Sequence, residues 1–212
     1  MRPVAETAHG GADVIRRRHV IYVEGYDPQG AKKLLTDAGF PNGFKLTLHT
    51  PNGRYTNDVK IAEAVAQMLT RVGIETSLEA LPPAVFFSRA SQGGPDKTPE
   101  FSFILVGWAT PTGENSGSLV PLVNTFDRAK GTGTTNRGRY SNPEVDRLSA
   151  EALKSNDDAK RAQLLAQATE IAIEDVAIIP CHYQVNTWAL RKGLKYKARS
   201  DEYTLATYVS GD

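Results

Sequence analysis

The chain has 212 residues, of which 40% are hydrophobic and 23% are charged, and 25 basic against 24 acidic side chains leave a net charge of +1. This composition is typical of a globular protein with a buried core and a charged surface. A net charge near zero argues against a nucleic-acid partner, because such a partner requires a basic face that neutralises phosphates. No apolar run approaches the roughly 18 residues of a membrane-spanning helix.

The reactive side chains of the sequence predict no metal site, no other cofactor and no catalytic residue. A single cysteine, Cys181, excludes an internal disulfide and a zinc site built on cysteines. No Gly-x-Ser-x-Gly elbow and no phosphate-binding Gly-x-x-x-x-Gly-Lys loop is present. The four histidines are scattered and lack the spacing of metal ligands: His9, His19, His49 and His182.

Residues 1–25 differ in character from the rest of the chain. Their apolar stretch is broken by four consecutive basic residues, Arg16 to His19, so the pattern does not match a secretory signal peptide. We expect an irregular or artificial start, with at most a short strand from His19 to Val23. Regular patterning begins at Tyr26.

The first half of the regular part predicts alternating helices and strands. Asp27 and Pro28 open a helix that Gly39 ends, and Gly73 ends a strongly amphipathic second helix. Nearly continuous apolar sequence over 101–106 is typical of a strand that is buried on both faces. The strands expected in one sheet are Lys45–Thr50, Ile74–Leu81 and Phe101–Val106, and a third helix is expected at Pro83–Ser91.

The second half begins with a Gly/Thr/Ser-rich stretch, 107–138, that has little periodicity. Ser141 or Asn142 then caps a helix that begins at Pro143, and a capping motif over 155–158 precedes the longest helix. Two further strands are expected at Val176–Ile179 and Val185–Leu190. Helices that alternate with strands indicate an α/β fold, with a mixed sheet flanked by helices.

Trp108 is the first candidate for ligand binding, because it follows a predicted buried strand and opens a long polar loop. Ligands of open α/β sheets bind beyond the carboxyl ends of strands, and an aromatic face with several hydrogen-bonding groups suits a small molecule. The alternative is that Trp108 covers the core and that the loop is ordinary surface. The polar candidates of this loop are Thr110, Glu114, Asn115 and Ser116.

A second polar and aromatic set, Tyr183 and Asn186, lies in and beside a predicted strand. Both residues are candidates for ligand contact. For Trp188, in the same segment, packing in the core is the favoured interpretation.

Five motifs in a fixed order carry a resemblance to a known family, from Tyr26 to about Leu194. They read YDPQGAKKLLTDAGFPNGFKLTLHTPNGRY, DVKIAEAVAQMLTRVGIETSLEAL, FSFILVGW, RGRYSNPEVDRLSAEAL and KRAQLLAQATEIAIEDVAIIPCHYQVNTWALRKGL. This order resembles the C-terminal part of the extracytoplasmic solute-binding proteins of ABC transporters, family 5, which carry peptides, nickel and related solutes. The resemblance implies one lobe of a two-lobed periplasmic-binding-protein-like fold over 26–192, and a C-terminal segment over 193–212 that returns to the first lobe.

The function implied by the resemblance is that of the substrate-binding component of an importer, without enzymatic activity. The full-length protein would lie in the periplasm, close two lobes around a peptide or other small solute, and meet the membrane only through its permease. Peptide-binding members commonly hold the α-ammonium group with an acid shortly after the Gly-Trp pair. Pro111 stands near that place and Glu114 follows three residues later. We therefore do not assign the role of holding the α-ammonium group to a residue of this chain.

Two alternatives from other classes stay open. A small α/β hydrolase or transferase would use the loops of 107–138 and requires a nucleophile and a base within hydrogen-bonding reach. A free-standing interaction domain would show a face too apolar for a monomer.

Overall fold

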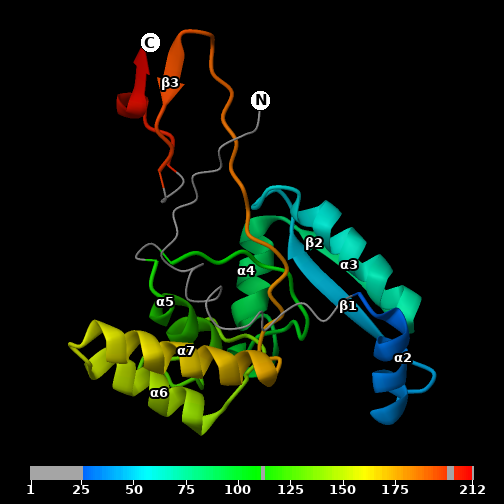
Figure 1. Ribbon diagram of the computed structural model, residues 1–212. Helices are drawn as coiled ribbons and strands as arrows, with labels where there is room; N and C mark the ends of the chain where they lie inside the picture. Colours follow the sequence, from blue (N-terminus) through cyan, green and yellow to red (C-terminus); the bar gives the residue numbers. More distant parts are fainter. Residues whose placement is uncertain (1–25, 111–112, 200–202, 212) are drawn as a thin grey trace.

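The computed structural model describes residues 26–110, 113–199 and 203–211 (Figure 1). The strand expected from His19 to Val23 lies outside these residues. The sheet is built on a parallel pair, β1 (Phe44–Pro51) and β2 (Ile74–Leu81), whose register runs from Phe44 opposite Ile74 to Pro51 opposite Leu81. Helix α3 (Asp58–Val72) connects the two strands and packs against both.

Two glycines allow the strands to begin side by side. Gly73 ends α3 with φ +112°, and its N–H donates to the carbonyls of the last helical turn. Gly43, with φ +68°, precedes β1, and a Cβ on it would lie 1.8 Å from the carbonyl oxygen of Gly73. Glycine is therefore required at position 43, both by the positive φ and by the close approach of the two backbones.

The third predicted strand joins the sheet at one point. The His49 N–H donates to the Phe103 carbonyl over 3.0 Å, and the Leu105 N–H donates to the His49 carbonyl over 2.9 Å, in a parallel bridge. Residues 101–106 thus lie on the side of β1 opposite β2. The expectation of burial on both faces is wrong, because only Phe101 of this segment is buried.

Helices cover the sheet as the sequence predicts. Asp27 caps α2 (Pro28–Asp37), because its side chain accepts hydrogen bonds from the N–H groups of Gln29 and Gly30. Helix α4 (Pro83–Gln92) buries Phe86 and Ala90 against Phe101 in a small cluster beside the sheet. The short η1 (Pro95–Lys97) follows.

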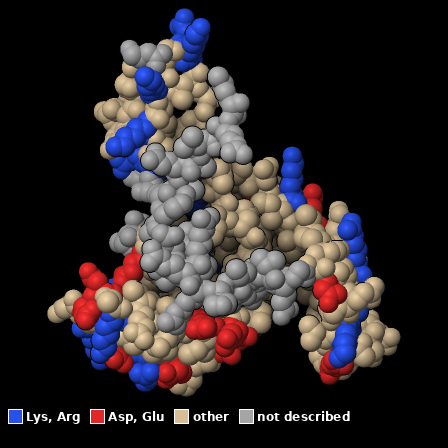
Figure 2. Space-filling model, viewed as in Figure 1, with Lys and Arg blue, Asp and Glu red and all other residues tan. Residues whose placement is uncertain are grey.

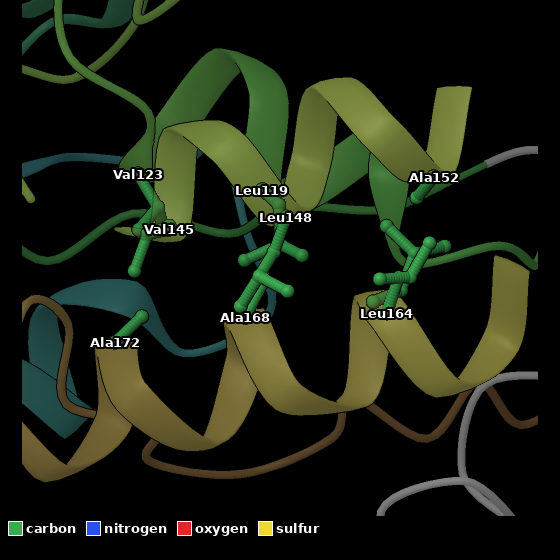
Figure 3. Packing of buried hydrophobic residues seen from close by; sticks show 9 residues of the cluster. Leu119, Val123, Val145, Leu148, Ala152, Leu164, Ala168 and Ala172 are labelled. Carbon is green, nitrogen blue, oxygen red and sulfur yellow. The ribbon is translucent and has the colours of Figure 1, made fainter. Parts of the chain in front are cut away.

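A second hydrophobic cluster lies in a helical hairpin formed by α6 (Pro143–Lys154) and α7 (Asp158–Glu174). The short α5 (Ser116–Ser118) and the π-turn η2 (Leu119–Val123) precede this hairpin and complete its core (Figure 3). The predicted caps are confirmed, since Asn142 and Asp157 each accept two backbone hydrogen bonds. The cluster consists of Leu119, Val123, Val145, Leu148, Ala152, Leu164, Leu165, Ala168 and Ala172.

The chain after α7 differs from the prediction. Residues 177–191 contain no strand, so both strands expected at 176–179 and 185–190 are wrong, although the sequence there is rich in residues that favour strands. A short antiparallel pair follows, β3 (Leu194–Tyr196) with β4 (Val209–Gly211), and η3 (Ala206–Tyr208) lies between them. Figure 1 shows this hairpin at one end of the molecule, away from α6 and α7.

The described elements form an α/β fold in which the parallel and antiparallel pairings belong to two separate small sheets. No helix in the described part of the chain combines the length and the apolar character needed to cross a membrane.

Candidate functional site

The carboxyl ends of β1 and of the 101–106 segment meet at one edge of the sheet. Tyr55, in the loop after β1, donates a hydrogen bond from its hydroxyl to the Gly107 carbonyl over 3.1 Å. A Cβ on Gly107 would lie 2.7 Å from the Tyr55 ring. The absence of a side chain at Gly107 therefore lets this ring pack directly on the backbone next to Trp108.

Asp58 holds the loop that carries Tyr55. Its carboxylate accepts hydrogen bonds from the backbone N–H groups of Arg54 (2.9 Å), Tyr55 (3.0 Å) and Val59 (2.9 Å), and from Gly53 over 3.3 Å. Burial raises the pKa of this carboxyl, but the four backbone donors together outweigh burial and hold the pKa below its ordinary value. The loop at this edge is thus fixed by one buried carboxylate.

Trp108 lies where the sequence predicts, at the carboxyl end of the 101–106 segment. Its indole N–H donates to the Gly117 carbonyl over 3.0 Å, and 45% of the residue is exposed. It is not among the buried residues of either hydrophobic cluster. The hydrogen bond fixes the edge of the indole and leaves an exposed aromatic surface.

Two predicted polar candidates contact helix α7, and a third, Ser116, contacts one of these two. Glu114 pairs with Arg161, and the Ser116 hydroxyl donates to Glu114 over 2.8 Å. The side-chain hydrogen bond from Arg161 is the main reason that the pKa of Glu114 lies below its ordinary value. The Asn115 amide donates to the hydroxyl of Thr169. These contacts fasten the loop to the helical hairpin.

The other predicted residues are more dispersed. Thr110 contacts the loop itself, because a Cβ on Gly117 would lie 3.0 Å from its methyl group. Tyr183 is 72% exposed, and Asn186 accepts a hydrogen bond from Gln184 over 3.0 Å. In the described part of the chain, no hydrogen bond or ring contact joins either residue to Trp108.

Trp188 packs outside both hydrophobic clusters, so its assignment to the core is wrong. Its indole N–H donates to the Thr204 hydroxyl over 2.9 Å, and its ring lies 5.3 Å from that of Tyr196. It stabilises the C-terminal hairpin.

An open groove of about 670 Å³ runs between α3 and the extended segment after α7. Only part of the apolar stripe of α3 is buried. Ala62 and Ala66 are buried, whereas Met68 is 45% exposed and lines the groove. The lining residues are Asn57, Lys60, Ile61, Ala64, Val65, Met68, Ile179, Pro180, Cys181 and His182.

Sequence reasoning missed a charged network between β1, β2 and α4. His49 Nε2 lies 3.1 Å from the Glu79 carboxylate, and Arg89 pairs with both Glu79 and Glu100. The His49 ring stacks on Phe101 with ring centroids 3.8 Å apart. The alternation of polar residues along both strands was the available signal, but only their parallel register brings His49 opposite Glu79.

Potential metal ligands do not gather in the described ranges, which contain no group of three or more His, Cys, Asp or Glu side chains suited to hold an ion.

Comparison with known proteins identifies the family. Residues 5–130 match the family described as bacterial extracellular solute-binding proteins, family 5 Middle. This match includes most of the 1–25 stretch. The glutathione-binding protein GsiB of Escherichia coli (strain K12) is 34% identical over 158 residues, which are 73% of this chain. The chain spans only 30% of the length of that relative.

Solved structures with the same fold include periplasmic binding proteins. DppA from Helicobacter pylori, in complex with the peptide STSA, is 28% identical with a TM-score of 0.62, over 72% of this chain and 28% of that one. HbpA2 from Haemophilus parasuis is 25% identical with a TM-score of 0.74, over 92% and 37%. A dipeptide-binding protein from Pseudoalteromonas sp. SM9913, in complex with Met-Leu, is 28% identical with a TM-score of 0.60, over 72% and 29%.

These relatives are solute-binding proteins and not enzymes, which removes the hydrolase or transferase alternative. The periplasmic-binding-protein-like α/β fold expected from the sequence is confirmed. The chain belongs to the bacterial extracellular solute-binding proteins of family 5.

Proposed function

We propose that this chain forms part of the substrate-binding component of an ABC importer. The whole protein binds a peptide or related small solute in a cleft between two lobes, in the periplasm, and delivers it to a membrane permease. The chain supplies the lobe over 26–192, and the segment over 193–212 continues toward the other lobe. This reading rests on family membership and on the surface around Trp108.

The observation that carries the proposal is the exposed indole of Trp108 at the carboxyl edge of the parallel strands. Its N–H is occupied by Gly117, so its orientation is set before any ligand arrives. A preoriented aromatic face of this kind contributes to affinity because little side-chain freedom is lost on binding. Thr110 offers a neighbouring hydroxyl, and Tyr183 and Asn186 are the contacts proposed from the extended segment.

Peptide-like solutes are favoured by what the relatives bind. GsiB is named for glutathione, and the structures of DppA and of the Pseudoalteromonas protein hold a tetrapeptide and a dipeptide. The presence of Pro111 near the usual position of an acid argues that a peptide's ammonium group is held differently here.

The extended segment after α7 supports a larger assembly around this chain. Its side chains include Ile179 and Val185, which are 58% and 76% exposed, and the apolar groove on α3 lies beside it. Exposure of these apolar side chains to water is unfavourable, so we expect the rest of the whole protein to cover part of them.

The test compares Trp108→Ala with Trp188→Ala in the whole protein that contains this chain, by titration calorimetry with Met-Leu, glutathione and a tetrapeptide. Loss of the Trp108 ring should weaken binding by on the order of 1–3 kcal/mol, without a comparable change in the melting temperature of the unliganded protein. Trp188→Ala is the matched control, because it removes an indole that packs against the C-terminal hairpin and not one at the edge of the sheet. If Trp108→Ala lowers the melting temperature but does not separately weaken binding, the ligand site must lie elsewhere than at Trp108.

A further inference from the structure

The charge of the chain is unevenly distributed, with an excess of basic residues near its C-terminal end. Residues 191–202 contain five basic against two acidic side chains, so the remaining residues contain 20 basic against 22 acidic ones. No acidic residue occurs between Asp175 and Asp201. The two acids of the basic stretch, Asp201 and Glu202, lie outside the described residues. The net charge of +1 therefore conceals a local excess of positive charge.

The C-terminal hairpin sorts the side chains of this stretch by face. The pairing of β3 with β4 continues through the Lys197 N–H, which donates to the Tyr208 carbonyl over 3.1 Å. Because side chains alternate along a strand, Lys195 and Lys197 share one face and Tyr196 lies on the other. The Trp188 ring packs 5.3 Å from that of Tyr196 and occupies the second face. The two lysines thus extend from the face opposite Trp188.

The basic side chains of this region are accessible. Arg191, Lys192, Lys195 and Lys197 are exposed, and we refer to these four residues as the basic patch. Arg191, Lys192 and Lys197 form no ion pair with the residues that the structure describes. Figure 2 shows Lys and Arg side chains over the hairpin with no acidic side chain beside them in this view, and Figure 1 places the hairpin at one end of the molecule.

The form of the basic patch suits an extended anionic surface better than a small anion. A small anion is held by donors that converge on one point, whereas these long side chains are exposed and follow one another along the chain. Clusters of about four to eight Lys or Arg residues are attracted to the negative surface of a bilayer with anionic headgroups. Leu194 and Tyr203, which are 45% and 68% exposed, add apolar and aromatic surface of the kind that lies at such an interface.

We propose that the basic patch docks this chain on the surface of an anionic phospholipid bilayer. This inference goes beyond the proposed function, because it adds a direct contact with lipid to the contact with a permease. The attraction between exposed charges is screened by salt, with a Debye length that falls from about 30 Å at 0.01 M to about 3 Å at 1 M. Docking through the basic patch is therefore reversible and sensitive to salt.

The test measures how much of the 212-residue chain sediments with sucrose-loaded vesicles. One set of vesicles contains phosphatidylcholine alone, and the other contains phosphatidylcholine and phosphatidylglycerol in equal amounts. At about 20 mM salt we expect the anionic vesicles to bind roughly five times as much of the chain as the neutral vesicles do. At about 500 mM salt this difference should disappear.

Two triple variants separate the basic patch from the overall charge. The patch variant replaces three exposed cations by glutamine, at Arg191, Lys192 and Lys197. The matched control replaces three exposed cations elsewhere by glutamine, at Lys32, Arg71 and Arg128. Both variants have the same net charge, and substitutions at exposed positions should leave their melting temperatures within about 2 °C of the wild type. The patch variant should lose most of its binding to anionic vesicles, and the control should keep it.

Several results would overturn the proposal. These are equal binding to neutral and anionic vesicles, binding that persists at the higher salt concentration, and equal losses in the patch variant and the control. Absence of binding to anionic vesicles would also overturn it and would favour an acidic protein surface as the partner of the basic patch. The lipid and salt comparisons use the wild-type chain, so they decide the question even if a variant does not fold.

The two proposals fail in different ways. If the chain binds anionic vesicles but no peptide binds the whole protein, only the proposed function fails. If peptides bind the whole protein but neither it nor the 212-residue chain binds anionic vesicles, only the contact with lipid fails.

Discussion

At the scale of single residues, charged groups decide how the candidate site is held. Asp58 fixes the loop of Tyr55 with backbone hydrogen bonds, and the pair of Glu114 with Arg161 ties the loop after Trp108 to α7. Glu114 was predicted as a ligand contact, and the structure gives it a second role that the sequence did not reveal. The ligand contacts of Glu114, Asn115 and Ser116 stay predictions.

Asp58→Ala should destabilise the chain by about 2 kcal/mol, because four backbone N–H groups lose their acceptor. Asp158→Ala is the matched control: Asp158 is also the first residue of a helix, but it is exposed. Urea unfolding monitored by circular dichroism gives both values. Similar losses in the two variants would mean that the helix dipole, and not the loop, accounts for the effect of Asp58.

The network around Arg89 predicts an acid sensitivity. Side-chain hydrogen bonds from Arg89 hold the pKa of both Glu79 and Glu100 below the ordinary value of 4.5. Carboxyls with a lowered folded pKa stabilise the fold fully above their unfolded pKa, and this contribution is lost as the pH falls through the folded pKa. The melting temperature should therefore drop as the pH falls below 4.5.

Arg89→Met should flatten this drop, because both carboxyls lose their arginine partner, whereas Arg139→Met, which removes a guanidinium from the Phe126 ring, should not. Scanning calorimetry between about pH 3 and pH 6 covers the relevant range. The same pH dependence in the wild type and in Arg89→Met would contradict the assignment.

At the scale of elements, the parts of the fold with local causes could be predicted. Asp27 and Asn142 cap helices within their own sequence neighbourhood, and Gly73 ends α3, so these signals survive in the structure. A strand depends on a partner instead, and the β-branched pattern at 176–190 could not show that no described strand pairs with it. A β-branched pattern shows only that a segment can form a strand. The strand forms only where a neighbouring strand is available to pair with it.

The candidate site shows the same division. Trp108 could be predicted because it follows an apolar run, which is a local signal. Tyr55 could not, because it lies 52 residues from its partner Gly107. Its role depends on the pairing of β1 with the segment 101–106, which the sequence does not encode locally.

Gly43→Ala should destabilise the chain by about 2 kcal/mol or more, because its Cβ would meet the Gly73 carbonyl and its φ is positive. Gly39→Ala is the matched control with φ +87° and no atom within 4 Å of its added Cβ. Gly39→Ala should lower the free energy of unfolding by only about 1–2 kcal/mol. Chemical denaturation measures the difference, and equal losses would show that the two backbones can move apart freely.

At the scale of the whole molecule, two hydrophobic clusters and a separate hairpin share one chain. The α4 cluster supports the sheet, while α6 and α7 form their own core. Tyr203 of the C-terminal hairpin is 68% exposed, and Tyr196 and Tyr208 are half-buried within that hairpin. Figure 2 shows basic and acidic side chains intermixed over α6 and α7, and basic side chains over the C-terminal hairpin.

Removal of residues 194–212 should leave the unfolding of the helical hairpin nearly unchanged, because β3 and β4 contribute to neither cluster. Hydrogen exchange of α6 and α7 amides in the shortened and complete chains provides the measurement. A strong loss of protection in α7 would mean that the C-terminal hairpin stabilises this part of the fold.

The most direct test of solute recognition uses the two tryptophans of the chain, whose indole N–H groups give separate NMR signals. Peptides such as Met-Leu and glutathione are titrated to about 10 mM, since a surface without the remainder of its cleft should bind weakly. We predict that the indole signal of Trp108 shifts in a saturable manner with at least one peptide, while that of Trp188 stays fixed. A shift of Trp188 alone, or no shift of Trp108 with any peptide, would contradict the account.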